Sequence, residues 1–475
     1  MPSPNAPVVI LGGGLTGISA AIHLRRPWTL FEAEARLGGH ARTDEREGYR
    51  FDRTGHWLHL RDPQVQRMVD ELLPGQMATV ARKARIFSHG RLTRYPYQAN
   101  LHGLPPEIVK ECLLGVVEAE VASARRAAAA AAAAVTDPEA EPTNFEEYCL
   151  RHFGAGISRH FMIPYNERLW GTSPRDITAA WCARFVPRPN LEQVIAGAVG
   201  AGPPELGYNI SFRYPKAGGI ETFTRALQTR MAGGQVHTSS TPDVVDWRRK
   251  QIEVGGERIS YEALVSTIPL PELLRRMPEL PAEIEAAASR LRCTTLTYLN
   301  LATRTTPPAD FHWIYVPEPK YPFYRAGVYS NAMSSMAPTG GASLYVEMAA
   351  RGPVSEADLR GAFAGLVEAG ALRSPADVLF AEPREIKYAY VIFDHAYYAA
   401  TQAIFAFLDA HQIFPRGRYG AWTYNAMEDC VLAGREVAET IENRLDRVAR
   451  LDRPSAADSS AAAAAPASAR GPRNP

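Results

Sequence analysis

The chain has 475 residues, with 52 Lys+Arg against 51 Asp+Glu and a net charge of +1. This balance gives no broad attraction to nucleic acid or to anionic lipid, so neither is an expected partner. No stretch reaches the roughly 18 apolar residues of a membrane span, and no signal peptide precedes the first apolar strand. The five cysteines lack metal-site spacing. We expect a cytoplasmic protein of two or three domains that binds a small molecule and no metal.

The N-terminal segment PVVILGGGLTGISAAIHL predicts a buried strand, a glycine turn and a helix, and WTLFEAE predicts a second strand that ends at Glu32. Gly12, Gly14 and Gly17 fit the GxGxxG pattern, with Leu15 and Thr16 opening the helix. A helix N-terminus there would hold a pyrophosphate, and Glu32 would accept hydrogen bonds from a ribose. The alternative, a glycine-rich turn in a nucleotide-free domain, leaves Glu32 without a role.

Later segments alternate between helical and strand patterns. Residues 101–204 read mostly as helix, whereas QIEVGGERISYEALVSTIP, SLYVEM and LTYLNLA read as strands, and a helix with one apolar face starts near Met427. These patterns predict an α/β fold with a discontinuous Rossmann-like nucleotide-binding domain, a helical insertion and a mixed-sheet substrate domain. The expected divisions are residues 1–90, 211–300 and 386–450 for nucleotide binding, 91–210 for the insertion, 301–385 for the mixed sheet and 451–475 for a disordered tail.

The segment AEARLGGHART places Gly38, Gly39 and His40 shortly after Glu32. It resembles the second glycine motif of the FAD-dependent amine oxidase and protoporphyrinogen oxidase superfamily, which includes the UDP-galactopyranose mutases. The resemblance implies FAD rather than NAD as the cofactor.

Further phrases resemble the mutase branch of that superfamily, from residue 8 to about 445. YRFDRTGHWLHL carries His56 and His59 at two histidine positions, and YNERLWGTSPRD carries a Trp-Gly pair at Trp170. Other matching positions are Arg184, Arg188, Val244, Arg325, Gly417, Arg418, Tyr424 and Met427. The resemblance implies that Gly417, Met427, Val244 and His56 join the glycine motifs at the FAD. It further implies catalytic or substrate contacts from His56, Trp170, Arg188, Arg325 and Tyr424.

Mutases of this branch interconvert the pyranose and furanose forms of a nucleotide sugar through an adduct between the sugar and N5 of reduced flavin. The resemblance therefore implies a mutase that acts on a nucleotide-activated sugar.

Two departures from the pattern leave other functions open. They are Thr294, in place of an arginine that binds the substrate diphosphate, and Ala426, in place of an aspartate. The first alternative is a FAD-dependent oxidase or desaturase, whose pocket the aromatic segments YPFYRAGVY and YAYVIFDHAYY would line. The second is a FAD-bearing protein without activity. For Trp170 and the two histidines, a purely structural role is the competing interpretation.

Overall fold

A five-stranded parallel sheet forms one half of the molecule. The computed structural model describes residues 8–132, 142–182, 186–202, 210–349 and 352–451. The sheet runs in the order β19 (Ile413–Pro415), β13 (Ala263–Ser266), β1 (Val8–Leu11), β2 (Trp28–Phe31) and β9 (Gly234–His237). All residues of β1, β2 and β13 are buried, because parallel strands are covered on both faces and need apolar residues throughout. The sheet therefore joins four stretches of chain that lie far apart in sequence.

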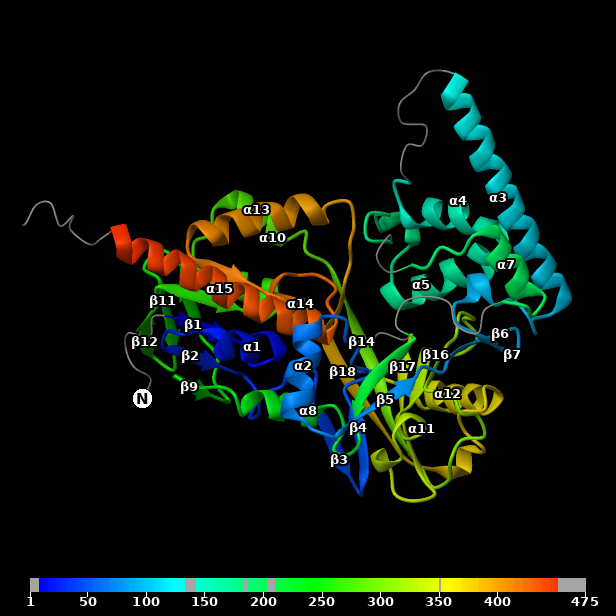
Figure 1. Ribbon diagram of the computed structural model, residues 1–475, viewed down its shortest axis with the longest axis horizontal. Coiled ribbons are helices and arrows are strands. Elements are labelled where there is room, and N and C mark those ends of the chain that lie inside the picture. The colour runs from blue at the N-terminus through cyan, green and yellow to red at the C-terminus, as the bar shows by residue number, and fades with distance from the viewer. Residues whose placement is uncertain (1–7, 133–141, 183–185, 203–209, 350–351, 452–475) are drawn as a thin grey trace, which may run out of the picture.

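Helices α1 (Leu15–His23) and α15 (Met427–Leu451) cover this sheet side by side, as Figure 1 shows. The hydroxyl of Ser19 on α1 donates a 2.6 Å hydrogen bond to the carbonyl of Val431 on α15. The start of α15 at Met427 confirms the predicted helix, and its Val431, Ala438 and Ile441 are buried as the apolar spacing requires. Further helices here are α9 (Leu270–Arg275), α10 (Ala282–Ala288), α13 (Tyr397–Ala410) and α14 (Gly417–Gly420).

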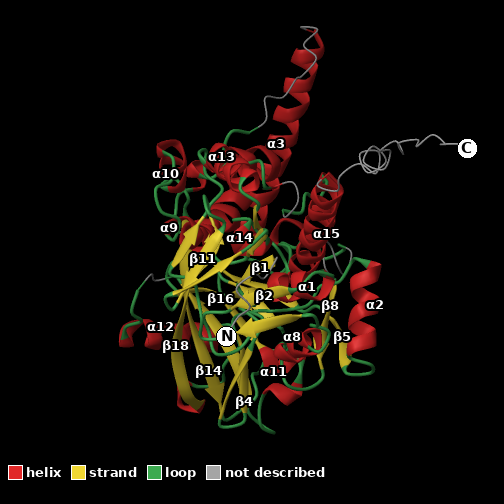
Figure 2. Cartoon of the chain, turned by 90° about the vertical axis from the view of Figure 1, so that its left-hand side faces the viewer, coloured by secondary structure: helices red, strands yellow, loops and turns green. Residues whose placement is uncertain are grey.

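A seven-stranded mixed sheet forms the second half. Its order is β18 (Val378–Val391), β14 (Cys293–Thr303), β17 (Ala342–Met348), β16 (Phe323–Val328), β15 (Trp313–Tyr315), β6 (Ala84–Ser88) and β7 (Arg91–Arg94). Neighbouring strands are antiparallel except β15 and β6, which are parallel. Helix α12 (Glu356–Glu368) and the short α11 (Tyr329–Ala332) lie beside the sheet in Figure 1. Figure 2 shows β14 and β18 running its length.

The predicted helical insertion stands apart from both sheets, at the upper right of Figure 1. It contains α3 (Pro106–Ala132), α4 (Phe145–Ile157), α5 (Ile163–Trp170) and α7 (Leu191–Ala198), and a π-turn at Ser158–Met162 joins α4 to α5. Arg168 ties α5 to the mixed sheet, since its guanidinium donates to the carbonyls of Val316, Glu318, Tyr321 and Phe323. This anchor fixes the end of α5, where Trp170 lies.

Smaller elements complete the fold. They are the hairpin β3 (Thr43–Arg46) and β4 (Tyr49–Asp52), the pair β5 (Met77–Ala81) and β8 (Ser211–Pro215), the sheet of β10 (Val244–Asp246), β11 (Gln251–Val254) and β12 (Glu257–Ser260), and helices α2 (Pro63–Leu72) and α8 (Glu221–Gln228). Asp52, at the end of β4, is buried and accepts hydrogen bonds from the Thr43 hydroxyl at 2.7 Å, the Tyr214 hydroxyl at 2.5 Å and the Ile220 N–H at 3.2 Å. It thereby fixes the loop that continues to His56.

The α/β class and the combination of a parallel sheet, a helical insertion and a mixed sheet are as expected from the sequence. We retain the residue boundaries of the domains as a proposal, with β6 and β7 added to the mixed-sheet region. Arg184 and most of the expected tail, residues 452–475, lie outside the described residues. Among the residues described, no helix is long and apolar enough to cross a membrane.

Candidate active site

The first glycine loop connects β1 to α1 at the carboxyl edge of the parallel sheet. A Cβ atom added at Gly17 would lie 2.0 Å from the carbonyl oxygen of Gly12, so only glycine allows the helix to start this close to the strand. Gly14 caps α1 without a side-chain hydrogen bond, and the first turn of α1 contains no acidic residue. The N–H groups and positive dipole end of α1 therefore remain available for an anion.

The second glycine loop lies directly against the first. The N–H of Gly38 donates a 2.8 Å hydrogen bond to the carbonyl of Gly13. A Cβ at Gly14 would meet only the Cα of Gly39, at 3.8 Å, and a Cβ at Gly39 would lie 3.1 Å from the Cα of Gly14. The two backbones thus lie against each other with no side chain between them, and we call this side-chain-free pair of loops the glycine slot. Such a slot fits the pyrophosphate of a dinucleotide, which the backbone must approach closely.

Glu32 lies immediately after β2 and holds the glycine loop in place. Its buried carboxylate accepts the N–H of Gly13 at 2.7 Å and the N–H of Glu34 at 2.9 Å. A carboxylate offers about four acceptor positions, so capacity for ribose hydroxyls remains. The N–H of Ser240 donates to the Glu32 carbonyl at 2.8 Å, which brings the segment before Val244 and β10 beside this end of the slot.

His40 and His56 lie at the other end of the slot. Burial, with smaller contributions from neighbouring cationic groups, lowers the pKa of His40 to about 3. Burial and the charge of Arg418 lower the pKa of His56 to about 4, although hydrogen bonds with the backbone of Thr54 and Arg53 oppose the shift, so both rings are neutral at pH 7. The Nδ1 atoms of both rings are buried without a hydrogen-bond partner among the described residues. Buried polar atoms are normally paired, so these two fit a bound group that supplies a partner.

The loop before α15 contacts the start of α1. Gly417 has a φ of 74°, and a Cβ there would lie 2.3 Å from the hydroxyl oxygen of Thr16. At the start of α15 the Asp429 carboxylate accepts the Ala426 N–H at 2.8 Å. The buried Glu428 accepts the backbone N–H groups of Arg61 and Asp62. The helix end that begins at Met427 is thus partly compensated by acidic groups.

Arg325 lies in a cluster of buried tyrosines on the mixed sheet. One of its terminal nitrogens donates to the Glu347 carboxylate at 2.6 Å and to the Tyr390 hydroxyl at 2.5 Å. Glu347 is fully buried and lies opposite Arg325 in the register of β16 and β17. Other members of the cluster are Tyr165, Tyr315, Tyr324 and Tyr345, all close enough to Arg325 for electrostatic coupling. A buried cation here is already balanced by one carboxylate.

Trp170 is both packed and next to a cavity. Its side chain is buried, and its N–H donates to the Asn166 side chain at 3.2 Å, as a structural tryptophan requires. The ring also contacts Tyr390, with centroids 5.8 Å apart. It lines a cavity of about 510 Å³ together with Gly171, Leu291, Arg292, Cys293, Thr294, Thr295 and Ile392. The two interpretations made from the sequence are therefore compatible.

A row of contacting side chains joins the glycine slot to this cavity. His40 contacts the Tyr419 ring at 5.4 Å, and the Arg418 guanidinium lies 5.9 Å from the Tyr419 centroid and 5.5 Å from that of Tyr390. Tyr390 then contacts Trp170. Arg418 also lies 4.5 Å from the Tyr424 ring and donates to the carbonyls of Asn425 and Ala389. The row brings together His40, Arg418 and Trp170, which come from three distant segments singled out in the sequence.

Two predicted residues lie elsewhere. Arg188 donates to His152 at 2.7 Å and lies 6.0 Å from the Tyr148 ring, so its contacts come from α4 rather than from the tyrosine cluster. His59 pairs with the Ser211 carbonyl at 3.1 Å, which is a structural contact.

Thr294 is buried opposite Tyr390 and accepts its N–H at 3.3 Å. Glu347 and Tyr419 were not among the predicted site residues, although Glu347 gave a signal as a charge within an apolar strand. Tyr390 was expected only as part of the aromatic segment YAYVIFDHAYY, which would line an oxidase pocket.

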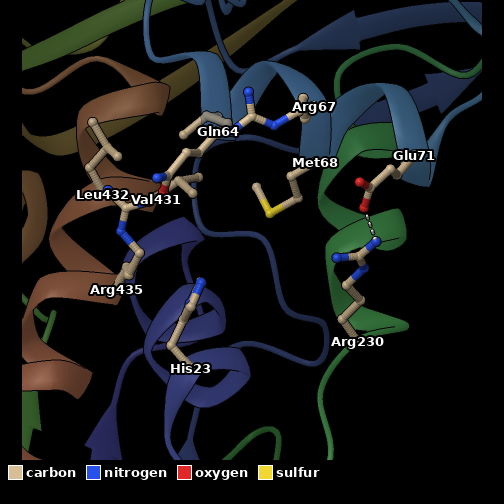
Figure 3. Close-up of a pocket in the computed structure, with 10 residues that line it drawn as sticks. His23, Gln64, Arg67, Met68, Glu71, Arg230, Val431, Leu432 and Arg435 are labelled. Carbon is tan, nitrogen blue, oxygen red and sulfur yellow. Dashed lines mark hydrogen bonds and ion pairs between the residues drawn. The ribbon is translucent and has the colours of Figure 1, made fainter.

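A second pocket, of about 380 Å³, lies between α1, α2 and α15. Figure 3 shows that His23, at the C-terminal end of α1, points into it together with Gln64, Arg67, Met68, Glu71, Arg230 and Arg435. The pocket is thus at the opposite end of α1 from the glycine slot.

Comparison with known proteins agrees with this geometry. Residues 15–358 match the family of flavin containing amine oxidoreductases, so the chain belongs to that family. It is 30% identical over 315 residues to coproporphyrinogen III oxidase of Mycobacterium tuberculosis (strain ATCC 25618 / H37Rv), which covers 62% of this chain. The chain spans only 65% of the length of that relative. It is also 25% identical to protoporphyrinogen oxidase 2 of Arabidopsis thaliana, over 36% of this chain and 33% of the relative.

Solved structures give similarity over nearly the whole chain. A reduced UDP-galactopyranose mutase superposes with a TM-score of 0.83 at 27% identity, covering 93% of this chain and 94% of the mutase. A redesigned putrescine oxidase superposes with a TM-score of 0.63 at 16% identity, covering 93% and 100%, and shows the fold alone. Together with the glycine slot, family membership implies a flavin cofactor, and the expected likeness to the mutase branch is confirmed.

Proposed function

We propose that the chain is a FAD-dependent mutase that interconverts ring forms of a nucleotide-activated sugar. The row of contacts from His40 through Tyr419, Arg418 and Tyr390 to Trp170 carries this proposal. It joins the dinucleotide slot to a cavity with one aromatic wall. The whole-length similarity to a reduced UDP-galactopyranose mutase supports the same function.

Gly12, Gly14, Gly17, Gly38 and Gly39 would hold the pyrophosphate of FAD, and Glu32 would hold its ribose. Leu15 and Thr16 would bring the N-terminus of α1 to the phosphates, with Val244 near the adenine and Gly417 and Met427 near the flavin ring. When bound in its reduced form, FAD would supply the nucleophile for the sugar, which explains why the proposal needs no protein nucleophile.

The protein's own residues would orient the substrate and hold charge. Arg325 is fixed by Glu347 and Tyr390, so its position is set before any ligand arrives. Arg418 lies between Tyr390 and Tyr424 and keeps a positive charge close to the neutral His56. Trp170, Tyr424 and His56 would face the sugar and the flavin. Arg188 remains a proposed diphosphate contact, and replacing it with alanine should weaken nucleotide-sugar binding without changing the FAD content.

The test is a trapping experiment. The purified protein is reduced under anaerobic conditions and mixed separately with each member of a panel of nucleotide sugars in the presence of cyanoborohydride. The flavin is then extracted, and its mass is measured by mass spectrometry. A flavin that gains the mass of one hexose supports the mutase and identifies the sugar. Flavin of unchanged mass with every sugar contradicts it, as does protein purified without flavin.

An oxidase of the coproporphyrinogen III oxidase type is the second candidate. The 30% identity to such relatives favours it, as do Thr294 and Ala426 at positions where the mutase pattern has charged residues. Threonine cannot replace the bidentate grip of arginine on a diphosphate. Oxygen consumption in the presence of coproporphyrinogen III, with no hexose on the flavin, would select this candidate over the mutase.

A further inference from the structure

Eight described residues line the cavity beside Trp170, and of these Arg292 carries a formal charge. Its backbone is fixed, because its carbonyl accepts the N–H of Ile392 at 3.0 Å where β14 and β18 begin to pair. Its side chain is 48% exposed, so the guanidinium reaches the cavity without losing all of its hydration. The backbone of Arg292 is thus held in place while its charged side chain lines the cavity. The other lining residues have no formal charge.

The guanidinium of Arg292 is held only weakly. Its two contacts, to the Asp394 carboxylate and to the Thr172 hydroxyl, are both 3.5 Å long. Arg325 and Arg418, the arginines on the other side of Trp170 and Tyr390, hold their partners at 2.5–2.6 Å and 3.0–3.1 Å. Hydrogen bonds weaken steeply towards the long end of the range, so Arg292 is the arginine that can be redirected to a ligand.

The neighbours of Arg292 suit an incoming anion. Asp394 already accepts the Ala396 N–H at 3.1 Å, and a ligand anion would displace its second, weak contact with Arg292. Burial raises the pKa of the Cys293 thiol, so that group is uncharged at neutral pH and does not repel an anion. The Thr294 oxygen accepts the Tyr390 N–H, which leaves its hydroxyl proton to donate.

We propose that Arg292 binds an anionic group of the substrate in the cavity walled by Trp170. This proposal rests on the proposed function, because it assumes that the substrate enters beside Trp170. A guanidinium pairs with a phosphate or a carboxylate through two parallel hydrogen bonds, so the shared chemistry is an oxyanion. In a nucleotide sugar that group is the diphosphate, and in a tetrapyrrole it is a propionate. Arg292 would then supply the charge that Thr294, two residues further along, lacks.

The test measures the Kd of the flavin-loaded protein for a panel of nucleoside diphosphates (UDP, dTDP, GDP and ADP) and for coproporphyrin III by calorimetry, with Arg292→Ala, Arg292→Lys and the wild type. We expect the Kd of the bound probe to rise about tenfold or more in Arg292→Ala, since tenfold corresponds to about 1.4 kcal/mol. Arg292→Lys should restore part of the loss, because it keeps the charge without the fork. Arg67→Ala, in the pocket of Figure 3, is the matched control and should bind like the wild type.

The outcomes separate this inference from the function on which it rests. If a nucleoside diphosphate binds the wild type and Arg292→Ala equally, the inference is wrong and the mutase proposal stands. If only coproporphyrin III binds, and binds Arg292→Ala more weakly, the inference holds and the mutase proposal is wrong. If neither probe binds the wild type, both are wrong. Unchanged flavin absorbance in every variant confirms that the comparison is between loaded proteins.

Discussion

Arg325 and Glu347 face each other across β16 and β17, with a 2.6 Å hydrogen bond between a guanidinium nitrogen and a carboxylate that has no solvent exposure. Each charge compensates the other, and Glu347 depends on Arg325 because its carboxylate has no contact with solvent. Burial opposes the charge of Arg325, yet Glu347 and the surrounding tyrosines keep its pKa well above the usual value. Removing either partner would leave a buried charge alone.

The Arg325→Ala variant should lose about 3–5 kcal/mol in its free energy of unfolding, because it leaves the Glu347 carboxylate buried and unpaired. Urea denaturation followed by circular dichroism measures this loss. The double variant Arg325→Met, Glu347→Gln removes both charges and should recover much of it. A single variant as stable as the wild type would mean that water reaches Glu347.

Gly14→Ala should release the flavin without damaging the fold. Gly14 has a φ of −75°, and its added Cβ would meet only the Gly39 Cα at 3.8 Å, so the protein accommodates the methyl group. That methyl group would occupy the space of the pyrophosphate, so we expect the flavin Kd to rise by about 100-fold or more, close to 2.8 kcal/mol. The ratio of flavin to protein absorbance and the melting temperature of the apoprotein are the measurements.

Gly75→Ala is the control for the glycine prediction. Gly75 has a φ of 69°, and a Cβ added there would meet no atom within 4 Å. Alanine at this position therefore strains the backbone at a place that is remote from the glycine slot. This variant should lose some stability and keep its flavin. Equal flavin retention in Gly14→Ala and the wild type would contradict the assignment of the slot.

Asp52 should make the protein less stable as pH rises from about 4 to 7. Burial raises the pKa of Asp52 to about 7, although hydrogen bonds from Thr43 and Tyr214 oppose the shift. The folded state therefore binds more protons than the unfolded state between pH 4 and 7, and this contribution to stability falls with rising pH. The measurement is the difference in melting temperature between the wild type and Asp52→Asn, which cannot ionise at this position. The melting temperature of the wild type should fall relative to that of Asp52→Asn as the pH rises from about 4 to 7. A difference that does not change with pH would contradict the raised pKa of Asp52.

Arg418→Met should lower the free energy of unfolding by about 2–4 kcal/mol, because it removes charge-assisted hydrogen bonds to two carbonyls. Those carbonyls belong to Asn425 and Ala389, so the loss loosens the loop before α15 from β18. The same substitution at Arg435, which bonds the Gln64 side chain on the surface, should change stability by at most about 0.5 kcal/mol. Chemical denaturation of both variants in parallel tests the contrast.

The sequence predicted the parts whose causes are local. The glycine turn, Glu32 and the helix from Met427 follow from spacing and periodicity within one segment, and each is present in the structure. Trp170 lines a cavity, and its expected place beside the flavin and the substrate stays a prediction.

The cluster around Arg325 was not predictable in the same way. Glu347, Tyr390 and Arg325 belong to three strands, and their pairing depends on a register that no single segment fixes. Arg188 contacts His152 and Tyr148 on α4, and its expected contact with a substrate diphosphate stays a prediction.

The hydrogen bond between Ser19 and Val431 joins residues 412 positions apart. At a synthesis rate of about 5–20 residues per second, α1 would leave the ribosome roughly 20–80 seconds before its partner helix exists. During that time the apolar face of α1 has no α15 to cover it, and β13, once made, has no β19 to pair with. A nascent chain of this design therefore needs protection from aggregation until its last hundred residues are made, and a chain that stops before Met427 could not close its nucleotide-binding half.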